Sequence, residues 1–124
     1  MLGGNGESTL TYILSNMINA KEEFISLCKE KTPRCATITL EYWSIEEGTV
    51  ETPSINLKCY YTPEDMQEFL NKLDFEYDNG FGLQRLFGVV WFEDGTWAER
   101  GEYDGSEWWE LREIPEIPDH LKIR

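Results

Sequence analysis

Acidic and aromatic residues are the chemically distinctive part of this chain, and they concentrate between Leu86 and Glu113. The chain has 124 residues, of which 24 are Asp or Glu and only 11 are Lys or Arg. Four of its five tryptophans lie in this stretch: Trp91, Trp97, Trp108 and Trp109. Tryptophans anchor protein interfaces, and surrounding carboxylates accelerate the encounter with a basic partner. The stretch therefore predicts a protein-binding surface.

The residue types needed for catalysis do not occur in recognisable arrangements. Nucleophilic catalysis uses Ser or Cys beside a base, usually His, and the only histidine, His120, follows a Pro-containing segment. The spacing of Cys28 and Cys35 is not that of zinc ligands. Residues 104–107 are too short for a calcium loop, and residues 86–113 hold no Lys that could assist a metal nuclease. We therefore expect no enzyme activity, no metal and no cofactor.

The acidic balance restricts the class of partner. Net charge is −13 at pH 7, and residues 62–124 carry −10 of it. DNA, RNA and anionic membranes are bound through Lys and Arg that neutralise phosphates, so direct binding to them is not expected. A basic protein is the expected partner.

The compartment is predicted from cysteine usage and hydropathy. Three cysteines, an odd number, in a chain with a sizeable core indicate reduced thiols. No apolar run approaches the roughly 18 residues of a membrane helix. The N-terminus lacks a basic region followed by an apolar one, so no secretory signal is expected. These features predict a cytoplasmic protein.

Residues 86–113 are predicted to form a three-stranded antiparallel meander. Asp94-Gly95 and Asp104-Gly105 suit two-residue turns, because both central residues of a type I′ turn need positive φ. Such turns set the register of both hairpins. The predicted pairs are Phe92 with Trp97, Val90 with Glu99 and Gly88 with Gly101, then Tyr103 with Ser106, Gly101 with Trp108, Glu99 with Glu110 and Trp97 with Arg112.

This register assigns each side chain to a face, because side chains alternate along a strand. The face expected to meet two helices carries Phe87, Val89, Trp91, Ala98, Arg100, Trp109 and Leu111. The other face carries Leu86, Val90, Phe92, Trp97, Glu99, Tyr103, Trp108, Glu110 and Arg112. Two interpretations of the second face remain open: an exposed recognition patch, or a surface that Trp108 and long loops shield.

Glu99 opposite Glu110 is a like-charge pair, which Arg112 or a basic partner would offset. From the pair alone, Glu99→Gln is expected to stabilise the domain.

The rest of the chain supplies two helices and two more strands. Ser8 or Thr9 caps a first helix that ends before Pro33, and Thr62-Pro63-Glu64-Asp65 begins a second. Alternating residues predict strands over 36–45 and 54–61, separated by a polar loop, and residues 74–84 are predicted to be a loop.

The predicted fold is α+β, in the order α-β-β-α-β-β-β, with an antiparallel sheet of about five strands and two helices on one face. Residues 1–124 form a single domain, with a frayed N-terminus over 1–7. Residues 114–124 form an extended tail, expected to be anchored on the surface through Ile114 and Ile117.

A resemblance suggests the origin of the chain. The segment VVWFEDGTWAERGEYDGSEWWELREIPEIP resembles C-terminal segments of small accessory proteins from tailed phages and prophages. The likeness covers about a quarter of the chain and lies in the spacing of Trp, Asp-Gly and Pro. It implies a phage or mobile-element origin and a bacterial host cytosol, and it transfers no functional residue.

Two hypotheses of function follow. The first is an acidic protein-binding module, an inhibitor or immunity-type protein whose carboxylates imitate the phosphates bound by a basic, nucleic-acid-handling enzyme. The second is a small structural or assembly protein that forms a homodimer through its aromatic face. The residues expected to contact a protein partner are Trp97, Glu99, Glu102, Tyr103, Asp104, Glu107, Trp108, Glu110 and Arg112.

Overall fold

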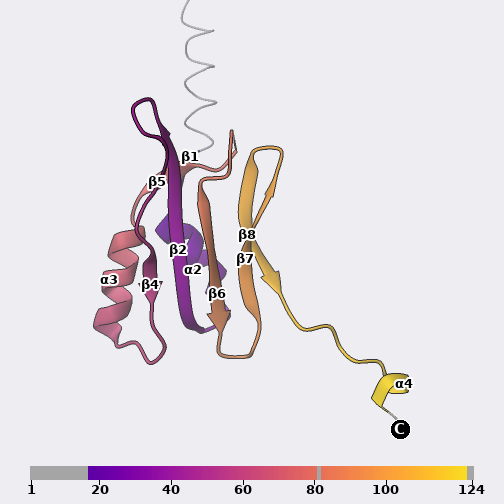
Figure 1. Ribbon diagram of the computed structural model, residues 1–124. Helices are drawn as coiled ribbons and strands as arrows, with labels where there is room; N and C mark the ends of the chain where they lie inside the picture. Colours follow the sequence, from indigo (N-terminus) through magenta and orange to yellow (C-terminus); the bar gives the residue numbers. More distant parts are fainter. Residues whose placement is uncertain (1–16, 81, 123–124) are drawn as a thin grey trace, which may run out of the picture.

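The computed structural model, which describes residues 17–80 and 82–122, has the predicted α+β class (Figure 1). Its main sheet has six antiparallel strands: β2 (Pro33–Ser44), β3 (Gly48–Glu51), β4 (Ile55–Leu57), β6 (Leu86–Phe92), β7 (Trp97–Tyr103) and β8 (Ser106–Arg112). A two-stranded sheet pairs β1 (Met17–Asn19) with β5 (Glu76–Asp78). The helices are α2 (Ala20–Leu27), α3 (Pro63–Leu73) and the short α4 (Asp119–Lys122).

The main sheet is ordered β3-β2-β6-β7-β8, with β4 also pairing to β2. Strands β3 and β4 lie against successive parts of β2, so the predicted hairpin exists but its second strand is interrupted. Thr52 bridges the interruption, because its backbone N–H and its hydroxyl both donate to the Leu40 carbonyl oxygen. Half of the loop predicted between residues 45 and 54 is therefore strand β3. The strand predicted over 54–61 is shorter than expected, because β4 ends at Leu57.

Helix α3 begins as its sequence predicts. The Thr62 hydroxyl accepts from the Asp65 backbone N–H at 3.1 Å, and the Asp65 carboxylate accepts from the Thr62 N–H at 3.0 Å. Pro63 occupies the first turn, where its missing N–H costs no helical hydrogen bond. This reciprocal capping box makes the start of α3 locally encoded.

The prediction for the first helix is confirmed over residues 20–27 and wrong over residues 17–19. Residues 17–19 are strand β1, and α2 begins after Asn19, whose side chain accepts from the Glu22 N–H at 3.0 Å. Residues 8 and 9, the predicted caps, lie outside the described residues. Strand β1 exists because it pairs with β5, in the segment predicted to be a loop. This pairing joins segments about 60 residues apart, so local spacing does not reveal it.

The register of the β6–β7 hairpin differs by one residue from the prediction. Val90 pairs with Ala98 and Trp91 with Trp97. The loop has three residues, because Gly95 takes a left-handed conformation (φ 88°) after a turn closed by its N–H bond to the Phe92 carbonyl. This is a type I turn followed by a glycine bulge, which Asp-Gly accommodates as readily as a two-residue turn.

That shift moves every side chain of β6 to the opposite face from the one predicted. Leu86, Val90 and Phe92 are buried in the core, while Trp91 lies on the opposite face and is 41% exposed. The β7–β8 hairpin, by contrast, has the predicted register throughout, and Asp104 and Gly105 both have positive φ. Its side chains therefore lie on the faces predicted for them.

The core lies between the sheet and the two longer helices. Ala36, Ile38, Val90 and Ala98 line the inner face of the sheet, and residues from α2 and α3 cover them. Phe24 of α2 meets Phe69 of α3 edge to face, with ring centroids 5.0 Å apart. Figure 1 shows α2 behind the sheet, so the front of that view is the face that neither α2 nor α3 covers.

We expect Gly88→Ala to lower the free energy of unfolding by at least about 1–3 kcal/mol, the usual cost of overpacking. A Cβ at Gly88 would lie 2.3 Å from the Thr37 carbonyl oxygen, a backbone atom that cannot turn away. Gly101→Ala is the matched control, because its nearest contact is the partly exposed Trp108 ring at 2.7 Å, which can rotate. Urea unfolding measures both, and a larger loss for Gly101→Ala would contradict the β2–β6 register.

Candidate protein-binding surface

The sheet face away from α2 and α3, here called the open face, is ordered in rows that cross four strands. Adjacent pairings place Cys35, Trp91, Trp97 and Arg112 in one row. The next row holds Thr37, Val89, Glu99 and Glu110. Continuing the same registers, Thr39, Phe87, Gly101 and Trp108 form a third. The face thus alternates aromatic rows with an acidic one.

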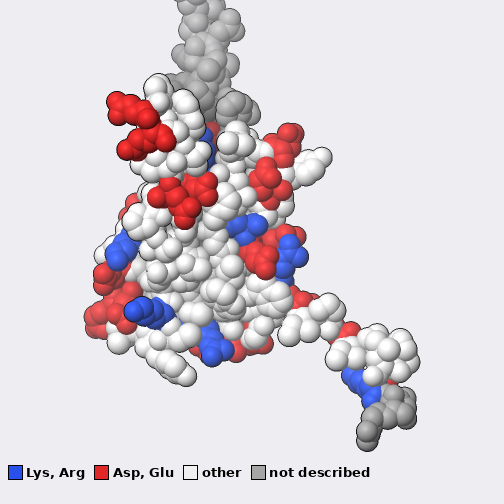
Figure 2. All heavy atoms as spheres, in the orientation of Figure 1, with Lys and Arg blue, Asp and Glu red and all other residues white. Residues whose placement is uncertain are grey.

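Aromatic rings dominate the middle of the open face. Trp91 and Trp97 lie opposite each other, and Trp108 lies over the bare backbone of Gly101. Trp108 is 39% exposed and Trp97 is half-buried. Figure 2, which views this face, shows a broad uncharged area over the middle of the sheet, with acidic side chains above it and to its right and Lys or Arg side chains at its lower edge and on either side. The structure contains a feature of each interpretation, because Trp91 and Trp108 are partly exposed while Trp108 also covers Gly101.

The acidic row carries a partly neutralised charge cluster. Glu99 and Glu110 face each other as predicted, and Arg112 lies 3.4 Å from Glu99 and 3.2 Å from Glu110. Trp97 also donates its indole N–H to Glu99 at 2.8 Å. All three charged side chains are nearly half exposed, so solvent screens their attraction. Two carboxylates therefore share one guanidinium and retain net negative charge.

A second acidic pair lies on the same face. Glu41 of β2 pairs with Glu51 of β3, and Glu41 falls on the open face by alternation from Thr37 and Thr39. Among the described residues no Lys or Arg lies within 4.0 Å of either carboxylate. The sequence pattern does not reveal this pair, because residue 51 lies in the segment predicted to be a polar loop.

The other predicted contact residues divide between the β7–β8 turn and the core. Glu102, Tyr103 and Asp104 are exposed at the turn, on the rim of the sheet. Glu107 is the exception, because it is buried on the inner face and cannot contact a partner. Trp43 and Trp91 lie exposed on the open face but were not among the predicted residues. Trp91 was missed because the bulged turn reverses the facing of β6.

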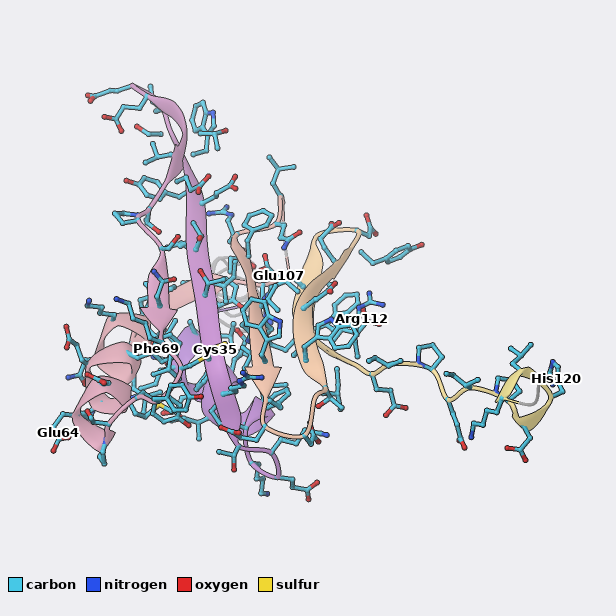
Figure 3. The ribbon with its side chains drawn as sticks, turned by 60° about the horizontal axis from the view of Figure 1, so that its bottom comes forward. Cys35, Glu64, Phe69, Glu107, Arg112 and His120 are labelled. Atoms are coloured by element: carbon cyan, nitrogen blue, oxygen red, sulfur yellow. The ribbon has the colours of Figure 1, made fainter. Side chains whose placement is uncertain are left out.

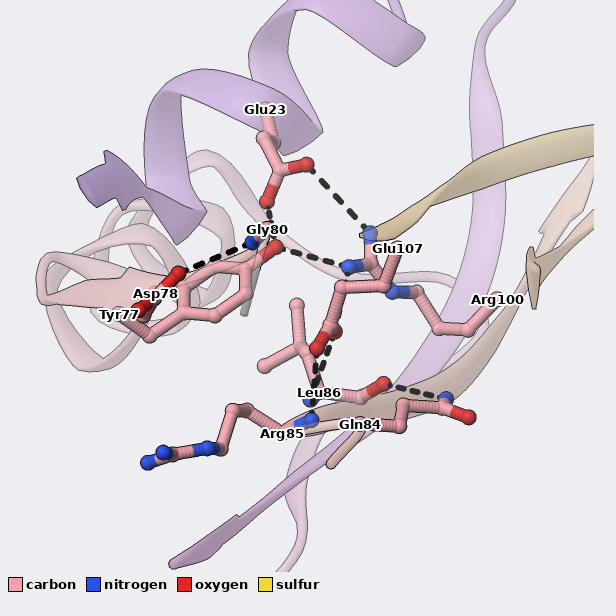
Figure 4. Close-up of polar contacts among 9 residues, drawn as sticks. All are labelled: Glu23, Tyr77, Asp78, Gly80, Gln84, Arg85, Leu86, Arg100 and Glu107. Atoms are coloured by element: carbon pink, nitrogen blue, oxygen red, sulfur yellow. Dashed lines mark hydrogen bonds and ion pairs between the residues drawn. The ribbon is translucent and has the colours of Figure 1, made fainter. Parts of the chain in front are cut away.

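Glu107 instead belongs to a buried polar network (Figure 4). Its carboxylate accepts from the backbone N–H groups of Arg85 and Leu86, at 2.7 and 2.9 Å. The Arg100 guanidinium, whose side chain is only 2% exposed, donates to the same carboxylate at 2.8 Å. These contacts hold the beginning of β8 against the beginning of β6.

The same guanidinium links the sheet to α2 and β5. It lies 3.5 Å from the Glu23 carboxylate of α2 and donates to the Tyr77 hydroxyl at 2.8 Å. Its carbon lies 5.0 Å from the Trp109 ring centroid, a cation–π distance. Tyr77 also donates to Glu23, and burial together with that carboxylate raises the pKa of the Tyr77 hydroxyl. The network therefore keeps Arg100 inward and fixes which face of β7 is open.

Among residues with other chemistry, Cys35 lies on the open face beside Cys59, and His120 lies far from both. Figure 3 shows His120 at the far end of a C-terminal segment that projects from the domain. Within residues 17–80 and 82–122, no three His, Cys, Asp or Glu side chains are grouped so as to hold a metal ion. Burial raises the pKa of the Cys28 thiol to about 12, which suppresses its thiolate at neutral pH.

Comparison with known proteins gives no match to a protein-family model, a curated protein or a solved structure. No helix within the described ranges is long and apolar enough to cross a membrane.

We expect Arg100→Met to lower the free energy of unfolding by about 3–5 kcal/mol, because it leaves Glu107 buried without its cation. Arg112→Met is the matched control, since it removes a half-exposed guanidinium and should cost less than about 1 kcal/mol. Urea unfolding at neutral pH measures both. Equal losses in the two variants would show that the buried network does not hold the fold.

Glu99→Gln is now expected not to raise the melting temperature, contrary to the expectation from the like-charge pair alone. The substitution removes a charge that pairs with Arg112 and accepts from Trp97. Glu51→Gln should raise the melting temperature slightly, because it relieves repulsion from Glu41 without breaking an ion pair. The corresponding gain in the free energy of unfolding should be less than about 1 kcal/mol. Thermal unfolding measures both variants. A melting temperature that rose for Glu99→Gln but not for Glu51→Gln would contradict the role of Arg112.

Proposed function

We propose that this chain is a non-enzymatic binding module whose open face docks on a basic protein. The observation that carries the proposal is a sheet face with aromatic rings at its centre and unbalanced carboxylates around them. Four glutamates lie on this face by register, against two arginines, Arg85 and Arg112. Large exposed apolar patches rimmed by polar residues are typical of protein-interaction sites.

The aromatic rows supply the binding energy in this proposal. Tryptophan is the residue most enriched among interface hot spots, and each hot spot costs at least about 2 kcal/mol of binding when truncated. Trp91, Trp97 and Trp108 are held by strand pairing on both sides of β7, so little side-chain or backbone order is lost on docking. A flat, preorganised face suits a folded partner.

In this proposal the carboxylates determine that the binding surface of the partner is positively charged. Lys or Arg side chains of a partner would complete the coordination that Arg112 alone begins between Glu99 and Glu110. Two copies meeting through this face would bring eight glutamates against four arginines. Charge therefore favours a basic partner over the alternative hypothesis of self-association through the open face.

The partner class follows from the spacing of charge. Basic clefts belong mostly to proteins that bind nucleic acids, and carboxylates at regular strand positions can occupy such a cleft in place of phosphates. We infer an inhibitor or immunity-type role toward a nucleic-acid-handling enzyme, in keeping with the resemblance to phage accessory proteins. Such binding would be salt-sensitive and would compete with nucleic acid.

The test is capture of a partner from bacterial lysate on immobilised protein. We expect a basic nucleic-acid enzyme that is retained at low salt and released by high salt or by added duplex DNA. Trp97→Ala combined with Trp108→Ala should weaken its binding at least about tenfold for each residue, from the hot-spot magnitude above. Circular dichroism should show that this variant stays folded, because both rings lie outside the core.

The control is Tyr60→Asn, which removes the most exposed aromatic ring of the domain, 97% accessible and outside the open face. Asn tolerates the positive φ of 62° at this position. Equal loss of binding in both variants, or a captured protein that DNA does not displace, would contradict the proposal. Unfolding of the double tryptophan variant would instead assign those rings to the core.

A further inference from the structure

The C-terminal segment does not anchor on its own domain, which corrects the expectation for Ile114 and Ile117. After β8 the chain continues as an arm, residues 113–122, that projects away from the body (Figures 1 and 3). Ile114, Ile117 and Leu121 are 75%, 55% and 66% exposed. The arm's described hydrogen bond and ion pair, from Leu121 to Pro118 and from Lys122 to Asp119, are internal to it.

An apolar groove lies on the inner face of the sheet, on the opposite side from the open face. It runs between α2 and β8 as two adjoining hollows of about 350 and 290 Å³, which share Ser26 and Leu27. Ile18 and Trp109 line the first hollow, and Leu111, which is more than half exposed, lines the second. Helix α2 therefore leaves the inner face of β8 incompletely covered.

The arm and the groove are chemically complementary. The arm sequence Ile114-Pro115-Glu116-Ile117-Pro118 favours an extended, polyproline-like chain, which docks in aromatic-lined grooves at low entropic cost. Trp109 offers such a ring, and its buried indole N–H has no acceptor among the described residues. Lys29, Glu30 and Lys31 border the hollow at Leu111, and Lys31 is paired with Asp94, so Lys29 is the cation that can face the acidic Glu113 and Glu116 of an arm.

The direction of β8 excludes simple docking of an arm in its own groove. Trp109 borders the first hollow and Leu111 the second, so the strand runs along the groove and leaves it at the Lys31 end. To enter its own groove the arm would have to reverse at once, whereas it continues away from the domain (Figure 1). A groove on a second copy requires no reversal.

We propose that two copies of this chain exchange their C-terminal arms, each arm lying in the α2–β8 groove of the other. The contact is isologous, so it closes at two copies. Ile114 and Ile117 fill the apolar floor formed by Leu27, Trp109 and Leu111. Both open faces stay free in such a dimer, so this inference does not depend on the proposed function, and the dimer would present two docking surfaces.

Light scattering after gel filtration, with sedimentation over a dilution series, tests the exchange on the full chain. The wild type should be a dimer at concentrations on the order of 100 µM. Ile114→Glu with Ile117→Glu, in the arm, should raise the dissociation constant at least tenfold, and so should Leu111→Glu in the groove. All three side chains are exposed, so these variants should remain folded. Leu83→Glu, at another exposed apolar residue, is the matched control and should leave the dimer intact.

Mixing the arm variant with the groove variant gives the decisive measurement. Their heterodimer keeps one intact arm in one intact groove, so mixing should restore part of the dimer that neither variant forms alone. A wild type that is monomeric throughout the dilution series would overturn the exchange. A dimer that persists in the arm and groove variants would overturn it as well, and would point to the open face if Trp97→Ala with Trp108→Ala dissociated it.

Discussion

The buried guanidinium of Arg100 is the interaction on which the rest of the structure depends. It joins β7 to Glu107 of β8, Glu23 of α2 and Tyr77 of β5, and Glu107 in turn holds the backbone at the start of β6. Breaking a buried pair leaves an uncompensated charge, so this arrangement tolerates little movement of its elements. Because side chains alternate, an inward Arg100 places Trp97, Glu99 and Gly101 outward. The same network thus anchors the core and defines the open face.

The two faces of the sheet end up with different chemistry for a simple geometric reason. Within residues 17–80 and 82–122, the two longer helices, of 8 and 11 residues, both pack on one side of the six-stranded sheet. One face is therefore left open, with its tryptophans and carboxylates, and the covered face is itself incompletely closed beside β8. The domain consequently has two unlike surfaces: an acidic aromatic plane and an apolar groove. Their separation by the thickness of the sheet lets both be occupied together.

Charge is distributed in a way that supports this division. The open face carries acidic pairs at Glu41 with Glu51 and at Glu99 with Glu110, with Arg112 beside the second pair and Arg85 opposite Glu41. The groove is bordered by Lys29 and Lys31, although Lys31 also donates to Asp94 in the β6–β7 loop. That contact holds the pKa of the Asp94 carboxyl well below its usual range. It also connects the β6–β7 loop to the segment between α2 and β2.

The sequence by itself determined what short-range rules encode: the class α+β, the capped start of α3, the β7–β8 hairpin with Asp104 and Gly105 at its turn, and the pairing of Glu99 with Glu110. Only the tertiary structure decided the remainder. Asp94-Gly95 permits two loop lengths, and the one-residue difference reversed the facing of β6 and placed Trp91 outside. Strands β1 and β5 exist only as partners of each other. Glu107 is buried only because Arg100 balances its charge and two backbone N–H groups donate to its carboxylate. These features rest on contacts distant in sequence, whose energy no local pattern of residues records.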